Sequence, residues 1–238
     1  MAPLLLNAES LTSAEKNAIQ QALNHPNRPA ADKTRDASRK PAQLLAFYGI
    51  KPGMQVADMM SGGGYYAEIL SRYLGAESRV YAQNNSIALE RFADKAMAER
   101  LNGRDLSNVV RLDRELEQPG FPAGQLDVVM MGLFYHDSYW MNANRQTMNR
   151  SIFDALKPGG VFALWDHRAQ PGSGERDVKT LHRVDELLVI KEVLAAGFVL
   201  EANAEFLANS EDSHTLNVFQ PEIRGKTDRF VLRFRKPL

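Results

Sequence analysis

The stretch that decides the fold is residues 54–70, Met54-Gln-Val-Ala-Asp-Met-Met-Ser-Gly-Gly-Gly-Tyr-Tyr-Ala-Glu-Ile-Leu70. A short apolar run passes through Asp58 and meets three consecutive glycines at 62–64. Beyond them, apolar residues recur at spacings of three and four, the pattern of one helix face. The stretch therefore predicts a strand, a glycine turn and a helix. Glycines let a ligand approach the backbone, and a helix N-terminus offers free N–H groups, so we expect a nucleotide-like ligand.

Two ligand classes use this geometry. Gly62-x-Gly64-x-x-Ala67 fits the dinucleotide pattern G-x-G-x-x-G/A. Asp58 favours the other class, because a carboxylate repels a pyrophosphate but suits the ammonium and sulfonium of S-adenosylmethionine. An acid before such a turn resembles the first motif of class I S-adenosylmethionine-dependent methyltransferases, usually Asp-x-Gly-x-Gly-x-Gly. Met60 replaces the first glycine of that motif. A nicotinamide-dependent oxidoreductase and a noncatalytic S-adenosylmethionine-binding protein remain open as alternatives.

The composition narrows the class of protein. The chain has 238 residues, 44% hydrophobic and 24% charged, enough for one α/β domain with a full core. Basic and acidic residues number 29 each, which favours a small-molecule acceptor over nucleic acid. The lack of cysteine excludes disulfides and cysteine nucleophiles. No apolar run approaches a membrane span, so we expect a cytoplasmic protein, although a removed export signal stays open. Monomer and homodimer are both compatible with the sequence.

Apolar strands alternate with amphipathic helices along the rest of the chain. Strands are expected at the following positions: 54–59, 78–83, 108–113, 126–131, 161–165, 198–202 and 227–236. The run Leu156-Lys-Pro-Gly-Gly160 before an apolar strand is a second resemblance to the same family, which then covers about residues 41–238. The resemblance implies a Rossmann-like, doubly wound α/β fold with a seven-stranded sheet. Its last strand would be antiparallel, with one buried and one polar face.

The segment before the glycine turn is predicted to be a helical cap over residues 1–50, preceding a core over 51–238. Its first helix is expected over 10–24, capped by Ser10, Thr12 or Ser13, with Glu15 completing a capping box with Thr12. Residues 30–40 suit a helix but lack an apolar stripe. That helix is either a solvated connector or a lid that turns one of three side chains toward the ligand, namely Arg35, Asp36 or Arg39.

The resemblance also implies where the cofactor would be held. In this family an acid at the end of the second strand usually holds the ribose; Asn84 stands there, and its amide can also bind a diol. Asp113 or Arg114 lies where the family contacts adenine. The predicted cofactor-binding residues are Asp58, Met60, Ser61, Gly62, Gly64, Tyr65, Asn84, Asp113, Arg114 and Met131.

The acceptor side is predicted after the fourth and fifth strands, where His136-Asp137 and Asp166-His167 follow apolar runs. Loops at the carboxyl ends of such strands carry the site in doubly wound sheets. The predicted catalytic residues are His136, as base or positioning group, Asp137, and His167 as the second choice of base.

Other residues are less firmly placed by the sequence. His182 and Arg183 are expected at the rim, and the irregular segment 206–226 is an alternative location for the site. His136, Asp137, Asp166 and His167 are also possible metal ligands. Their spacing matches no known metal motif, so no metal is predicted.

Overall fold

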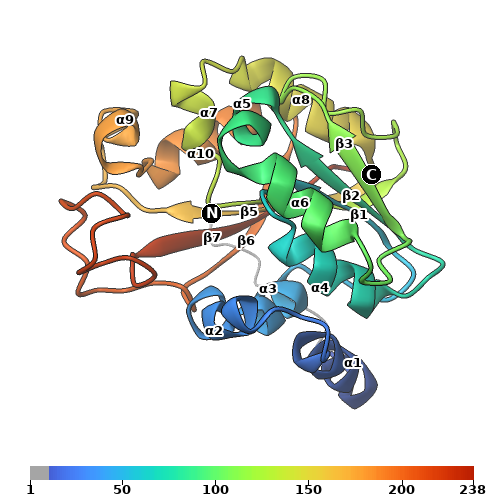
Figure 1. The fold of residues 1–238 in the computed structure, drawn as a ribbon. Coiled ribbons are helices and arrows are strands. Elements are labelled where there is room, and N and C mark those ends of the chain that lie inside the picture. Colours follow the sequence, from blue (N-terminus) through green and yellow to red (C-terminus); the bar gives the residue numbers. More distant parts are fainter. Residues whose placement is uncertain (1–10) are drawn as a thin grey trace.

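The computed structural model describes residues 11–238 and has a seven-stranded sheet at its centre, in the order β3-β2-β1-β4-β5-β7-β6 (Figure 1). The strands are β1 Gln55–Met59, β2 Arg79–Asn84, β3 Val109–Asp113, β4 Leu126–Gly132, β5 Leu156–His167, β6 Val199–Ala204 and β7 Arg229–Arg235. The first five are parallel, and β7 runs antiparallel to both its neighbours. The predicted doubly wound sheet with an antiparallel last strand is confirmed.

Helices connect the strands. They are α1 Ser13–Asn24, α2 Ala30–Arg39, α3 Pro41–Phe47, α4 Tyr65–Leu74, α5 Ser86–Ala88, α6 Asp94–Leu101, α7 Asp137–Trp140, α8 Arg145–Ala155, α9 Val178–Leu181 and α10 Glu186–Ala195. A π-helical turn, Leu89–Ala93, joins α5 to α6, so the helical segment after β2 is divided into three parts. The short helices α7 and α9 were not predicted, because four residues are too few to show helical periodicity.

The sheet is covered on both faces. Alternate residues of β1 point to opposite sides: Val56 joins the core beneath α1, α3 and α4, and Ala57 joins the core beneath α8 and α10. The two helical layers flank the sheet in Figure 1. Burial on both faces explains why the central strands are apolar runs rather than alternating sequences.

The last strand differs from its prediction in one respect. Alternation over 227–236 predicted a polar face open to solvent, but β7 lies between β5 and β6 and both of its faces are buried. Arg233 is only 6% exposed. Its charge is compensated by Glu201, whose carboxylate lies 2.6 Å from the guanidinium. Arg233 therefore alternates with apolar neighbours because it forms a buried ion pair, not because it meets water.

Of the N-terminal helices, α2 lies beside the glycine turn and α1 packs on α4. Thr12 and Glu15 form the predicted capping box, with the Thr12 hydroxyl accepting from the Glu15 N–H at 3.2 Å and the Glu15 carboxylate accepting from the Thr12 N–H at 2.8 Å. Ser10, the alternative cap, lies outside the described residues. The apolar face of α1 packs on α4 through Ile19 and Leu23, which fixes the start of α2 next to the turn.

Candidate functional site

The glycine turn joins β1 to α4 with the backbone geometry that its family motif requires. Gly62 and Gly64 have φ angles of 58° and 79°. Met60, which replaces the usual first glycine, also has a positive φ of 55°. This left-handed conformation is strained for a residue with a side chain. The departure from the motif therefore alters the side chain but not the path of the backbone.

The three glycines pack against the helical segment that follows β2. A Cβ on Gly64 would lie 2.7 Å from Cδ of Arg100, and one on Gly63 would lie 3.0 Å from Cβ of Ala96. A side chain at Gly64 would thus meet α6 rather than a ligand. The glycines are needed at least in part for close packing of the turn on α6.

Asp58, near the end of β1, forms hydrogen bonds with the glycine turn and with the start of α4. Its carboxylate is buried and accepts a hydrogen bond of 2.6 Å from the hydroxyl of Ser61, and it also accepts from the backbone N–H of Ala67 at the start of α4. Burial raises the pKa of Asp58 to about 6, and these hydrogen bonds together with the charges of Arg39 and Arg100 limit the rise. Asp58 thus links the strand, the turn and the helix.

The amides at the end of β2 hold the turn as well. Asn84 accepts from the N–H of Gly62 at 2.8 Å and donates to the carbonyl of Gly62 at 3.0 Å. Gln83 accepts from the N–H of Met60 at 3.1 Å and donates to the carbonyl of Arg114 at 2.6 Å. Both side chains are fully buried. Asn84 therefore has a structural task at the position where the family usually carries an acid.

The remaining predicted cofactor residues lie at the same edge of the sheet. Tyr65 begins α4 and donates its hydroxyl to Asp36 of α2 at 2.5 Å. Met131 is buried near the end of β4. Asp113 ends β3, exposed, and pairs with Arg111 at 2.9 Å. Arg114 follows it and lines a surface cavity of about 530 Å³. The carboxyl ends of the parallel strands bring these residues to one edge.

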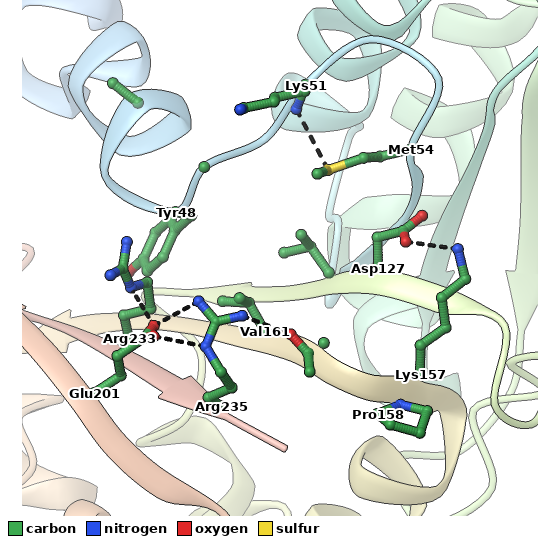
Figure 2. Close-up of a pocket in the computed structure, with 15 residues that line it drawn as sticks. Tyr48, Lys51, Met54, Asp127, Lys157, Pro158, Val161, Glu201, Arg233 and Arg235 are labelled. Carbon is green, nitrogen blue, oxygen red and sulfur yellow. Dashed lines mark hydrogen bonds and ion pairs between the residues drawn. The ribbon is translucent and has the colours of Figure 1, made fainter. Parts of the chain in front are cut away.

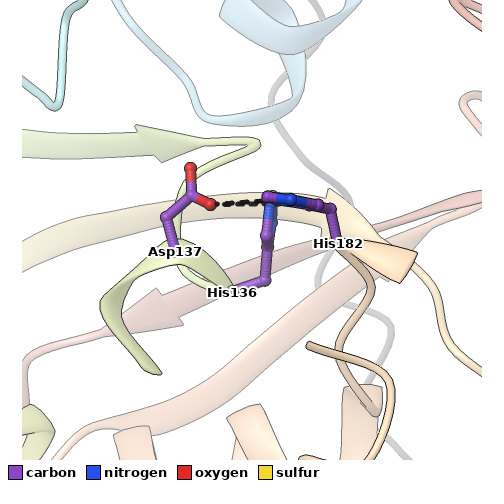
Figure 3. A group of neighbouring side chains, drawn as sticks. All are labelled: His136, Asp137 and His182. Carbon is purple, nitrogen blue, oxygen red and sulfur yellow. Dashed lines mark ion pairs between the residues drawn. The ribbon is translucent and has the colours of Figure 1, made fainter. Parts of the chain in front are cut away.

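His136 is the centre of a second cluster at this edge (Figure 3). Its Nδ1 lies 2.8 Å from Asp166, and its Nε2 lies 3.1 Å from Asp137. Burial alone would lower the pKa of His136, but the carboxylates of Asp166 and Asp137 outweigh burial and raise it to about 10. Burial opposes ionisation of Asp137 as well, yet the charge of His136 brings the pKa of Asp137 well below its usual range. His136 is therefore an imidazolium held between two carboxylates.

His167 has the opposite charge state. Its ring centre lies 5.7 Å from that of His136, and its Nδ1 lies 2.7 Å from the hydroxyl oxygen of Thr227. Burial and the neighbouring charge of His136 lower the pKa of His167 well below its ordinary value. At neutral pH this ring is neutral. Of the two predicted bases, only His167 has an unprotonated nitrogen available.

His182 completes the cluster from the loop after α9. Its Nδ1 lies 3.4 Å from Asp137, its ring stands edge-on to His136, and its φ of 54° is positive. Donor atoms of His136, Asp137 and His182 all lie within 4.8 Å of one another, a spacing that would also suit a divalent ion. The set considered from the sequence had Asp166 and His167 in place of His182, and no metal was assigned to it. Sequence analysis gave His182 only a rim position, because nothing local to it indicates contact with Asp137.

The structure changes the expected position of Arg183 and adds two residues, Thr227 and Arg229, to the site. Arg183 does not line the rim, because it is fully buried in an ion pair of 2.8 Å with Asp212. Thr227 and Arg229 were not predicted as site residues. They enter the site because β7 pairs with β5 and places Arg229 opposite His167. Their signal in the sequence was the polar run Arg-Gly-Lys-Thr-Asp-Arg before the last strand.

A separate cavity of about 380 Å³ opens at the opposite edge of the sheet (Figure 2). Its charged lining residues include Lys157, which pairs with Asp127 at 2.5 Å, and Arg235, which pairs with Glu201 at 2.6 Å. These pairs neutralise the charges that a ligand would need. The cavity also lies at the amino ends of the strands, away from the glycine turn.

Comparison with known proteins indicates the kind of domain that carries the site at the carboxyl edge of the sheet. A family model described as a methyltransferase domain matches residues 57–164, the part that holds the glycine turn, His136 and Asp137. Residues 57–164 therefore carry a methyltransferase domain, which supports the resemblance to class I S-adenosylmethionine-dependent methyltransferases. This domain implies S-adenosylmethionine as the cofactor. Within residues 11–238, no helix of this methyltransferase is long and apolar enough to cross a membrane.

Solved structures share the fold of this methyltransferase. A SAM-dependent methyltransferase from Aquifex aeolicus is 20% identical, with a TM-score of 0.62 and coverage of 92% of this chain and 97% of that one. An S-adenosylmethionine-dependent methyltransferase from Mesorhizobium loti is 16% identical, with a TM-score of 0.58 and coverage of 84% and 98%. A protein from Galdieria sulphuraria, described as a putative sarcosine dimethylglycine methyltransferase, is 15% identical, with a TM-score of 0.59 and coverage of 89% and 89%. At these identities the likeness concerns the fold alone.

Proposed function

We propose that this methyltransferase transfers a methyl group from S-adenosylmethionine to an oxygen, nitrogen or carbon atom of a small-molecule acceptor. One observation carries the proposal. The carboxyl edge of the sheet places the glycine turn after β1 beside the buried polar cluster that follows β4 and β5. A cofactor site and a proton-accepting group thus share one edge, as alignment of two reactants requires.

The residues around the turn fit the cofactor. Buried Asp58 and the positive-φ turn provide the negative charge and the accessible backbone that an ammonium group needs. Arg39 stacks on the ring of Tyr65 at 4.5 Å and makes no ion pair with any residue between 11 and 238. Its guanidinium is the partner we assign to the carboxylate of the cofactor. Asn84, Met131 and either Asp113 or Arg114 would line the nucleoside part.

The chemistry assigned to the protein is removal of the acceptor proton. The bound cofactor supplies a methyl group activated by its sulfonium. With Nδ1–H of His167 donated to Thr227, Nε2 of His167 holds the lone pair that takes the proton as the acceptor atom bonds to carbon and the sulfur–carbon bond breaks. His136 and Asp137 act as positioning groups, because burial, together with the charge on His136, keeps His167 neutral.

Helix α2 is assigned as a lid, and the division into a cap over 1–50 and a core over 51–238 rests on this role. Asp36 accepts from Tyr65 beside the turn and also pairs with Arg28 at 2.8 Å. The polar surface of α2 is thereby directed at the proposed cofactor site, which favours the lid over the solvated connector.

The test has two steps. Calorimetry with S-adenosylhomocysteine is expected to show binding, whereas NAD is expected to show none. Release of S-adenosylhomocysteine is then followed with a panel of small acids, amines and phenols. With a positive acceptor in hand, His167→Gln is expected to lose turnover while its cofactor affinity is unchanged. A variant that keeps full turnover would remove His167 from the proposal.

A noncatalytic protein that binds the same cofactor is the second candidate. The observation that favours it is Asn84, which bridges Gly62 where the family usually carries an acid for the ribose. This candidate predicts tight binding of S-adenosylhomocysteine with no turnover on any acceptor. Nucleic acid is not expected as an acceptor, and a salt-sensitive gel shift with transfer RNA would contradict that expectation.

A further inference from the structure

Arg229 is a buried cation without a carboxylate partner. It begins β7 and is only 4% exposed. Its Nε donates to the hydroxyl oxygen of Thr227 at 3.0 Å, and its Nη1 donates to the carbonyl of Ser38 at 2.8 Å. Both acceptors are neutral, and Arg229 makes no ion pair with any residue between 11 and 238. Arg183 and Arg233 are equally buried, but each pairs with a carboxylate.

A second buried polar group, the hydroxyl of Tyr66, lies near Arg229. The hydroxyl of Tyr66, in the first turn of α4, is buried and has no hydrogen-bond partner in the described structure. The positive charges of Arg39 and Arg229 both act on this hydroxyl. Ser38, which binds Arg229, directly precedes Arg39, so the two guanidinium groups approach the same region from α2 and β7. Arg39 is only partly buried, and the carboxylates of Asp58 and Asp36 act on the hydroxyl less strongly than either guanidinium. The buried Arg229 and the unpartnered hydroxyl are costly to bury together unless an anion joins them.

We propose that Arg229 and the Tyr66 hydroxyl form a binding site for an anionic group, a carboxylate or a phosphate, on the methyl acceptor. The inference rests on the proposed function for the identity of the acceptor, but the anion site itself does not. A guanidinium and a hydroxyl donate to either anion with charge-assisted hydrogen bonds. The substrate class that follows is a small acid or phosphate ester with a nucleophilic atom a short distance from its charge.

The link between Arg229 and His167 places this anion on the acceptor side. Both side chains contact the same hydroxyl, that of Thr227, at 3.0 Å and 2.7 Å. An acceptor held by Arg229 would therefore present its remaining atoms toward His167. Arg39, which stacks on the ring of Tyr65, is assigned to the carboxylate of the cofactor.

The experiment measures binding of inorganic phosphate and, in parallel, acetate to protein saturated with S-adenosylhomocysteine. Saturation occupies any position that belongs to the carboxylate of the cofactor. The unfolding temperature is followed against anion concentration at constant ionic strength with sodium chloride, in the parent and three variants. Arg229→Met removes the cation. Tyr66→Phe removes only the unpartnered hydroxyl, so it is expected to fold even if Arg229→Met does not. Arg150→Met is the control, since Arg150 lies exposed on α8 and pairs only with Asp154.

We expect a saturable response in the parent and in Arg150→Met to at least one anion. The apparent dissociation constant should rise about tenfold or more in Arg229→Met and about threefold or more in Tyr66→Phe. Equal responses in all four proteins would overturn the proposal. A response that appears only without S-adenosylhomocysteine would also overturn the proposal, because the site would then hold the carboxylate of the cofactor.

If S-adenosylhomocysteine does not bind, the proposed function fails separately from the anion site. In that case the anions are added to the protein without S-adenosylhomocysteine. A response that is lost in Arg229→Met would still support the anion site, and no response in the parent would overturn the proposal.

Discussion

At the scale of single residues, the site depends on ionisable side chains whose pKa values are shifted in different directions by their surroundings. His136 lies between two carboxylates, whereas His167 faces a hydroxyl and a positive charge. Sequence analysis correctly placed both histidines at the carboxyl edge of the sheet, because the apolar runs show where the strands end. It did not distinguish their charge states, since these depend on burial and, for His136, on Asp166, which reaches it only in the folded chain.

The charge states of the two histidines are directly testable. Because the native pKa of His136 is raised to about 10, the stabilisation from its charge is fully present below about pH 6.5 and is lost as the pH rises through 10. We expect nitrogen chemical shifts to report a protonated His136 at pH 8, while His167 stays neutral near pH 6. Asp166→Asn should lower the pKa of His136. A neutral His136 at pH 7 in the parent would contradict the description of the cluster.

Asp58 is expected to contribute a pH dependence of the same sign as that of His136, in a more acidic range. Its native pKa of about 6 lies above the unfolded value of about 3.8, so the native state holds the proton more tightly. Stability present below about pH 4 is therefore lost as the pH rises through 6, by at most about 3 kcal/mol. Urea unfolding between pH 4 and pH 7 should show this loss in the parent and not in Asp58→Asn. Parallel curves for the two proteins would mean that Asp58 titrates normally.

At the scale of elements, local patterns were sufficient for the glycine turn and for the long helices. Local patterns were insufficient for β7, because its buried arginines produce the same alternation of apolar and polar residues as a half-exposed strand. They were also insufficient for α7 and α9, which are too short to show helical periodicity. Sequence analysis also led us to expect a ligand at Gly64. That expectation stays a prediction, and the structure adds close packing of the turn on α6 at Gly64, a contact between residues more than thirty positions apart.

Packing of the turn on α6 can be separated from backbone strain by two alanine substitutions. Gly64 and Gly103 both have positive φ, 79° and 72°, but a Cβ at Gly103 meets nothing within 4 Å. Gly103→Ala should cost about 1 kcal/mol from conformation alone. Gly64→Ala should cost about 1–3 kcal/mol more, because its Cβ overlaps Arg100. Chemical denaturation measures both, and equal losses would show that the turn moves away from α6 at little cost.

At the scale of the whole molecule, the cap and the two clusters meet at one edge of a single sheet. Arg28, Asp36 and Tyr65 connect α2 to the glycine turn, and Arg229 connects β7 to α2 through Ser38. The segment before residue 50 is thus tied to both the cofactor side and the acceptor side. The general arrangement followed from the family motifs, but these cross-connections did not, because each joins side chains that are distant in the sequence.

The lid role of α2 predicts a change in its dynamics. Binding of S-adenosylhomocysteine should slow hydrogen exchange of the backbone amides in residues 30–39 about tenfold or more, because Arg39 gains a carboxylate partner. Arg39→Met should keep the fold and lose most of this protection. Helix α10, on the opposite face of the sheet, serves as the internal control and should be unaffected. Equal protection of both helices would indicate general stabilisation rather than closure of a lid.

The position of β7 inside the sheet sets an order of events during synthesis. β6 pairs only with β7, and β5 needs β7 to cover its second edge. Until residues 229–235 leave the ribosome, the nascent chain presents two unpaired strand edges, and such edges invite association between chains. The glycine turn can form early, whereas Arg229 and Thr227 arrive last and join the site together with the strand. Any condition that delays insertion of β7 should therefore appear first as aggregation of newly made chains, before it appears as a loss of stability in the finished protein.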